Sequence, residues 1–120
     1  MAKKQISLDH IQHHDTRRMA YFLNGLDEEL IEIPFDWKEM KMADRLSGAC
    51  KFISTTSATS VTITVYFCQG YAEALKIGKV NLLPNTPNAK WNVNGSLMYL
   101  IETEDGERLS EILSFFAGRE

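Results

Sequence analysis

The fold is decided by residues 61–68, Val-Thr-Ile-Thr-Val-Tyr-Phe-Cys, whose side chains alternate in character along the chain. The apolar positions from Val61 to Phe67 fall on one side of an extended backbone, and the positions between them fall on the other. A second β-rich run at residues 50–54 precedes this stretch, and the Ser/Thr/Ala segment 55–60 joins the two. Two such runs with a short polar connection predict an antiparallel hairpin.

A second hairpin is predicted nearer the C-terminus, where Asn94-Gly95 is flanked by β-rich residues on both sides. This dipeptide is the strongest short hairpin signal that a sequence can offer. Residues 30–35 form another β-like run, which Pro34 keeps short or places at a sheet edge because proline donates no backbone hydrogen bond. A further strand is expected at residues 80–83.

Helices are predicted at both ends of the chain and at two places between them. Capping residues, glycine stops and apolar spacing place them at residues 7–25, 37–46, 71–77 and 105–118. Within the segment 37–46, Met40 and Met42 would equally suit an extended strand. The order of the elements predicts one α+β domain over residues 1–120, with an antiparallel sheet of about five strands and the N- and C-terminal helices packed on it.

Composition limits the class of protein. The 120 residues carry 13 basic and 16 acidic side chains, a formal net charge of −3. Nucleic-acid-binding modules usually have a basic excess, so we expect no nucleic-acid partner.

No stretch of the sequence resembles a signal peptide or a membrane span, which favours a soluble cytoplasmic protein. Cys50 and Cys68 lack metal-binding spacing, so we expect both to be reduced thiols. No cofactor motif is present, and we expect no cofactor.

Charge is distributed unevenly, because residues 52–101 hold only four charged side chains: Glu73, Lys76, Lys79 and Lys90. Opposite the core-facing set of this segment we expect Thr62, Thr64, Tyr66 and Tyr99. Two terminal helices can hardly cover both faces of such a sheet, and tyrosine-containing, lysine-poor surfaces are typical of interface cores. We therefore predict a two-fold homodimer. The alternative is a threonine-rich face that is exposed to water.

All three histidines lie within five residues, at positions 10, 13 and 14. On a helix over residues 7–25, one ridge beside the apolar stripe would contain His10, His14, Arg17 and Tyr21. Three interpretations remain open: a solvated helix flank, a site for a small anionic or polar ligand, or a metal site. A metal would need a further ligand and is opposed by the arginine, so we assign this ridge to ligand binding and assign no metal.

Asp15 and Arg18 fall inside or beside the apolar arc of the same helix, where an unpaired charge would be costly. We expect them to form an ion pair three residues apart, packed against the sheet or a second subunit. An alternative is that the carboxylate orients a histidine, as in catalytic sites.

A second candidate surface is the loop 85–92, which is rich in asparagine and proline. Its candidate ligand-binding residues are Asn88, Lys90 and Trp91, because an indole beside a lysine can stack on a base or sugar. The alternative is ordinary turn chemistry. Cys68 is expected to be a core residue, since no base is evident that would make it a nucleophile.

Two classes of function therefore remain. The favoured one is a small non-enzymatic binding or adaptor protein that self-associates and binds a small anionic or polar ligand or a protein partner. The alternative is a small enzyme or ligand sensor that uses His10, His14 and Arg17.

Overall fold

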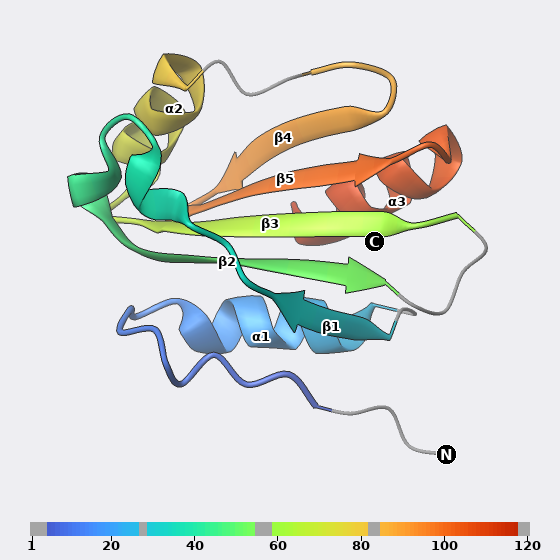
Figure 1. The fold of residues 1–120 in the computed structure, drawn as a ribbon, viewed down its shortest axis with the longest axis horizontal. Helices are drawn as coiled ribbons and strands as arrows, with labels where there is room; N and C mark the ends of the chain where they lie inside the picture. The colour runs from blue at the N-terminus through green and yellow to red at the C-terminus, as the bar shows by residue number, and fades with distance from the viewer. Residues whose placement is uncertain (1–4, 27–28, 55–58, 82–84, 118–120) are drawn as a thin grey trace.

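The computed structural model describes residues 5–26, 29–54, 59–81 and 85–117. They form an antiparallel sheet of five strands, three α-helices and two 3₁₀ turns (Figure 1). The elements in chain order are α1 (Thr16–Gly25), β1 (Leu30–Ile33), η1 (Trp37–Glu39), η2 (Ala43–Arg45), β2 (Leu46–Ser54), β3 (Val61–Cys68), α2 (Tyr71–Val80), β4 (Ala89–Asn94), β5 (Leu97–Thr103) and α3 (Gly106–Phe116). The predicted α+β architecture is confirmed.

The strand order is β1-β2-β3-β5-β4, and every neighbouring pair is antiparallel. Both predicted hairpins are present as β2–β3 and β4–β5. The turn between β4 and β5 places Gly95 at φ 60°, a left-handed conformation that glycine adopts without steric cost. β1 ends immediately before Pro34 and lies at the sheet edge, as its proline predicted.

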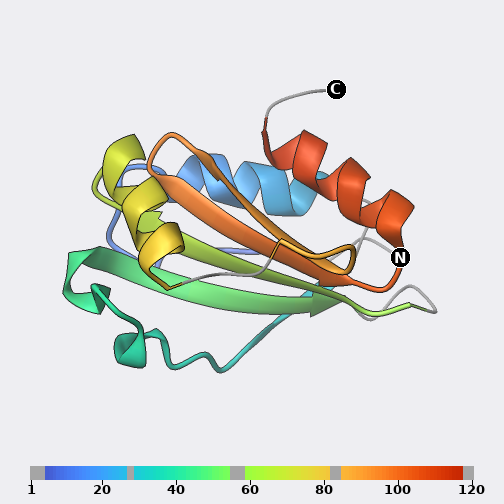
Figure 2. The same ribbon diagram turned by 90° about the horizontal axis from the view of Figure 1, so that it is seen from above.

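The two faces of the sheet are covered by different elements (Figure 2). One face, the α1/α3 face, packs against the two terminal helices. Its main buried side chains are Met19, Leu23, Val61, Ile63, Val65, Phe67, Leu97, Tyr99, Ile101, Leu109, Ile112 and Phe116. Burial of a large apolar side chain contributes roughly 1.5–3 kcal/mol, so this cluster holds both terminal helices on the sheet as expected. None of the helices described is long and apolar enough to cross a lipid bilayer.

The other face, the α2 face, is covered by α2 and by the segment that contains η1 and η2 (Figure 2). Tyr66 is 3% exposed and its ring lies 5.9 Å from that of Phe35, while Thr64 is 1% exposed. The surface that the sequence assigned to a dimer is thus largely covered by the chain itself. Tyr99 was also placed wrongly, because it pairs with Val65 and lies in the α1/α3 core. Charge depletion over residues 52–101 therefore reflects a sheet with two covered faces, and the homodimer stays a prediction.

The first helix begins at Thr16, nine residues later than the sequence indicated. A helix over residues 7–25 would place Ile6 and Asn24 about 27 Å apart at 1.5 Å per residue. In the structure the Asn24 side chain instead accepts from Ile6 N at 2.8 Å and donates to Ile6 O at 3.0 Å. The segment before α1 therefore runs back along the helix, and it contributes Leu8 and Ile11 to the core.

The single helix predicted at residues 37–46 is replaced by η1 and η2. Asp36 does cap η1, since its side chain accepts from Lys38 N at 3.2 Å. Met42 has a left-handed backbone with φ 62°, and an L-residue in that conformation interrupts a right-handed helix. Asp36 was therefore correctly predicted as a capping residue, but it caps a short 3₁₀ turn and not a helix over residues 37–46.

The strand predicted at residues 80–83 is not formed in its described part, because α2 continues through Gly78 to Val80. Residues 82–83 lie outside the described residues. The glycine that was expected to end α2 has a packing role instead: a Cβ built on Gly78 would lie 2.4 Å from Cζ3 of Trp91. The missing side chain makes room for the indole, which packs against the α2-face cluster.

Gly78→Ala is expected to lower the free energy of unfolding by up to about 2 kcal/mol. The methyl group displaces the indole of Trp91, and overpacking costs typically 1–3 kcal/mol, which outweighs a helix-propensity gain of about 1 kcal/mol. Denaturant unfolding measures the change. In a Trp91→Leu background the same substitution should become stabilising, because the clash is gone. A stabilising effect in the wild-type background would contradict the packing role of Gly78.

Candidate functional site

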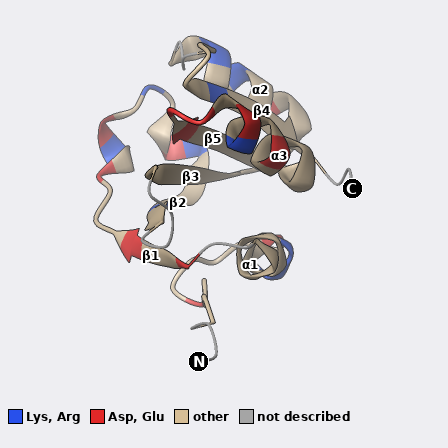
Figure 3. Ribbon diagram, turned by 90° about the vertical axis from the view of Figure 1, so that its right-hand side faces the viewer, with Lys and Arg blue, Asp and Glu red and all other residues tan. Residues whose placement is uncertain are grey.

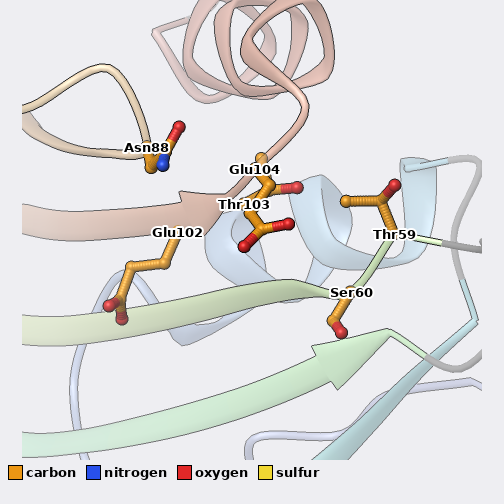
Figure 4. A pocket seen from close by; sticks show the side chains of 6 residues that line it. All are labelled: Thr59, Ser60, Asn88, Glu102, Thr103 and Glu104. Carbon is orange, nitrogen blue, oxygen red and sulfur yellow. The ribbon is translucent and has the colours of Figure 1, made fainter.

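A polar pocket of about 500 Å³ lies where three segments meet at one end of the sheet (Figure 4). The segment leading into β3, the loop before β4 and the end of β5 supply its lining residues: Thr59, Ser60, Asn88, Glu102, Thr103 and Glu104. Ligand pockets commonly enclose about 300–1,000 Å³, so the volume suits a small molecule. Seen from this end, acidic residues lie between β4 and α3 (Figure 3).

Backbone and capping interactions hold the pocket wall in place. Thr103 N donates to Asn88 O at 2.9 Å, which ties the loop before β4 to the end of β5. The Thr103 hydroxyl oxygen accepts from Asp105 N at 3.3 Å, and the Asp105 carboxylate accepts from Arg108 N at 3.2 Å to cap α3. These bonds fix the chain on both sides of Glu104.

The pocket carries uncompensated negative charge. Glu102 is half-buried and Glu104 is exposed, and within the described part of the chain neither forms an ion pair with Lys, Arg or His. Burial raises the pKa of Tyr66, and the charge of Glu102 raises it further. Two carboxylates among hydroxyl and amide groups favour a cation with hydrogen-bond donors.

The loop predicted to bind ligand is divided by the structure. Asn88 lines the pocket, whereas Lys90 is exposed outside it and Trp91 packs against α2 at Gly78. The lining residues that sequence reasoning missed are Thr59, Ser60, Glu102, Thr103 and Glu104. The available signal was the acidic run at 102–107, but the sequence alone does not show that it meets Asn88.

The predicted histidine ridge is not formed, because residues 10 and 14 precede the start of α1. His10 Nε2 lies 3.2 Å from Glu32 Oε2, and His14 Nε2 lies 3.5 Å from Asp15 Oδ2. Arg17 lines a separate small hollow of about 170 Å³, and Tyr21 is 73% exposed. These four residues therefore do not form the predicted helix ridge, and their role in ligand binding stays a prediction.

His13, which sequence reasoning had placed off the ridge, occupies a half-buried position. Its Nε2 lies 2.6 Å from Cys68 O, and because a carbonyl can only accept, Nε2 must carry the proton. Its Nδ1 accepts from Asp15 N at 3.0 Å. The ring also stacks on that of His14, with centroids 4.3 Å apart. These contacts fix both the orientation and the tautomer of His13.

Asp15 and Arg18 form the predicted pair and extend it into a network. Arg18 Nη2 lies 3.0 Å from Asp15 Oδ2, and the guanidinium also donates to Asn94 Oδ1 and O at 2.7 and 3.1 Å. Ser96 Oγ donates to the same carboxylate. Burial raises the pKa of Asp15, but the bonds from Arg18 and Ser96 outweigh it and hold the pKa below its ordinary 3.8. The network thus fastens α1 to the β4–β5 turn.

Cys68 is fully buried at the end of β3. Burial raises the pKa of its thiol to about 12, and the neighbouring Glu73 charge acts in the same direction. A thiol with so high a pKa is protonated near neutral pH and is a poor nucleophile. This supports the interpretation of Cys68 as a core residue.

No family model, curated protein or solved structure matches this chain.

Proposed function

We propose that this protein is a non-enzymatic binding protein whose ligand is a small organic cation, held in the pocket of Figure 4. The observation that carries the proposal is the pair of carboxylates, Glu102 and Glu104, that line a polar pocket of about 500 Å³ without an ion-pair partner among the described residues. The sequence led us to expect an anionic or polar ligand. The proposed ligand is still polar, but it is a cation and not an anion.

The shape and chemistry of the pocket favour an organic amine over a bare metal ion. A dehydrated ion fills only a small part of such a volume, whereas an amine with a carbon chain can occupy more of it. The carboxylates can accept charge-assisted hydrogen bonds from ammonium groups. The hydroxyl groups of Thr59 and Ser60 and the amide of Asn88 offer further acceptors.

Calorimetric titration and thermal unfolding with putrescine and spermidine test the proposal. A ligand at 100 times its Kd raises the free energy of unfolding by about 2.7 kcal/mol. Glu102→Gln and Glu104→Gln should each weaken binding by about tenfold or more, because a hydrogen bond to a charged group contributes roughly 1.5–3 kcal/mol. Both substitutions should leave the unliganded protein folded, since they break no described ion pair.

Glu107→Gln is the matched control, because Glu107 is an exposed carboxylate in the first turn of α3 that does not line the pocket. It should bind both amines as the wild type does. If Glu107→Gln weakens amine binding as much as the pocket variants do, the effect is general charge screening and the proposal is contradicted. The same holds if sodium chloride at matched ionic strength raises the thermal stability of the wild type as much as the amines do. Absence of binding to any amine tested would contradict the proposal as well.

A further inference from the structure

We propose that His13, His14 and Asp15 form a binding site for a divalent transition metal such as Zn²⁺. One ligand atom from each of these residues lies within 4.8 Å of the other two. Imidazole nitrogen and carboxylate oxygen are ordinary zinc ligands. The site lies just before α1 and is built from residues that do not line the pocket of the proposed function.

The separation of two of the ligand atoms already matches coordination. Two atoms bound tetrahedrally to zinc at about 2.0–2.2 Å lie about 3.3–3.6 Å from each other. His14 Nε2 and Asp15 Oδ2 are 3.5 Å apart. The His14 side chain is 69% exposed, so its ring is free to turn toward a metal without disturbing the core.

Hydrogen bonds hold His13 as the neutral tautomer with its proton on Nε2, which leaves Nδ1 as the nitrogen that could bind a metal. Its Nε2–H donates to Cys68 O at 2.6 Å, which leaves the Nδ1 lone pair directed toward Asp15 N. Histidine ligands commonly donate their second ring N–H to a backbone carbonyl, which fixes the tautomer and orientation of the ring. A tilted contact with Phe67 limits rotation of the His13 ring further. The ring of His14 stacks on that of His13 in the metal-free protein, and it must leave this stack before both rings can direct a lone pair at one ion.

In the metal-free protein, two of the proposed metal ligands already accept hydrogen bonds. Asp15 N donates to His13 Nδ1 at 3.0 Å, and the Asp15 carboxylate accepts from Arg18 and Ser96. A bound metal would have to displace the Asp15 N–H from Nδ1 and compete with Arg18 and Ser96 for the carboxylate. The two bonds from Arg18 to Asn94 would still hold the guanidinium in place. Three protein ligands leave the remaining coordination position of a tetrahedral ion to water.

The structure changes the ligand set that the sequence suggested. A helix over residues 7–25 would have paired His10 with His14, but His10 instead lies beside Glu32 at 3.2 Å. The two possibilities therefore predict different effects for single histidine variants. His10 and His14 are both exposed, so replacing either with alanine should leave the protein folded.

Calorimetric titration of the tag-free protein with Zn²⁺, and optical spectra with Co²⁺ as a tetrahedral probe, test the site. The wild type should bind one ion and give the visible bands of tetrahedral Co²⁺. Loss of an outer contact typically weakens metal binding by about 10–100-fold, so His14→Ala, which removes a ligand, should weaken it by about 100-fold or more. His10→Ala is the matched control and should bind Zn²⁺ as the wild type does.

Proton NMR of the imidazole rings provides a second readout, in which Zn²⁺ should shift the resonances of His13 and His14 and leave those of His10 in place. No Zn²⁺ binding by the wild type would overturn the proposal. Equal losses in His10→Ala and His14→Ala, or retained binding in His14→Ala, would overturn it too, because each outcome requires a different ligand set. The pocket variant Glu102→Gln should bind Zn²⁺ normally, which separates this test from that of the proposed function.

Discussion

Phe116→Ala is expected to lower the free energy of unfolding by about 3–5 kcal/mol, the usual cost of truncating a buried phenylalanine. The side chain is fully buried, and its ring lies 5.2 Å from Tyr99 and 5.9 Å from Phe22. It therefore joins α1, α3 and β5 in one aromatic contact. A domain of this size usually has only about 5–15 kcal/mol of stability, so the variant should unfold at a much lower denaturant concentration.

Phe115→Ala is the control for this substitution. Phe115 is the adjacent residue of the same helix and has the same side chain, but it is only half-buried. Denaturant unfolding should give a clearly smaller loss for Phe115→Ala. Equal losses would mean that helix propensity or general hydrophobicity, and not the enclosed aromatic contact, accounts for the effect.

Arg18→Ala is expected to lower the free energy of unfolding by about 2 kcal/mol. The substitution removes the bonds to Asp15 and both bonds to Asn94, and a hydrogen bond to a charged group contributes roughly 1.5–3 kcal/mol. It also leaves the Asp15 carboxylate, whose side chain is 19% exposed, without its cation. The Arg18 side chain is itself 35% exposed, so water screens part of the interaction and keeps the loss below that of a buried pair.

Arg17→Ala provides the matched control, because Arg17 is the preceding residue of α1 and is exposed. Its loss should stay within about 0.5 kcal/mol, as for most surface substitutions. Denaturant unfolding at low and at high salt completes the measurement. If the two arginine variants lose the same stability, the network between α1 and the β4–β5 turn contributes nothing specific.

The Asp15 network and the proposed metal site share one carboxylate, and this connects stability with binding. In the metal-free protein, Arg18 and Ser96 hold Asp15 in place at the start of α1. The β4–β5 turn thereby helps to position a carboxylate that we propose as a metal ligand. The pocket of the proposed function lies elsewhere, where the segment before β3, the loop before β4 and the end of β5 meet.

The sequence by itself determined several local elements of this protein. Alternation over residues 61–68 identified β3, Asn94-Gly95 identified the second hairpin, and Pro34 placed β1 at an edge. The Asp15–Arg18 pair was also predictable, because residues three apart face each other on a helix. Each of these signals lies within about ten neighbouring residues, where backbone sterics and side-chain period decide the outcome.

Tertiary structure alone decided which distant residues meet. The helix predicted from Ser7 was shortened because Asn24 binds the backbone of Ile6, a contact across 18 residues. α2 continues through Gly78, and the indole of Trp91 occupies the space that a side chain at this position would fill. The pocket joins Asn88 to the acidic end of β5, and His13 is fixed by the Cys68 carbonyl, 55 residues away. Local sequence periodicity does not specify strand order or long-range packing. These distant groups come together only when the whole chain folds and buries its apolar side chains.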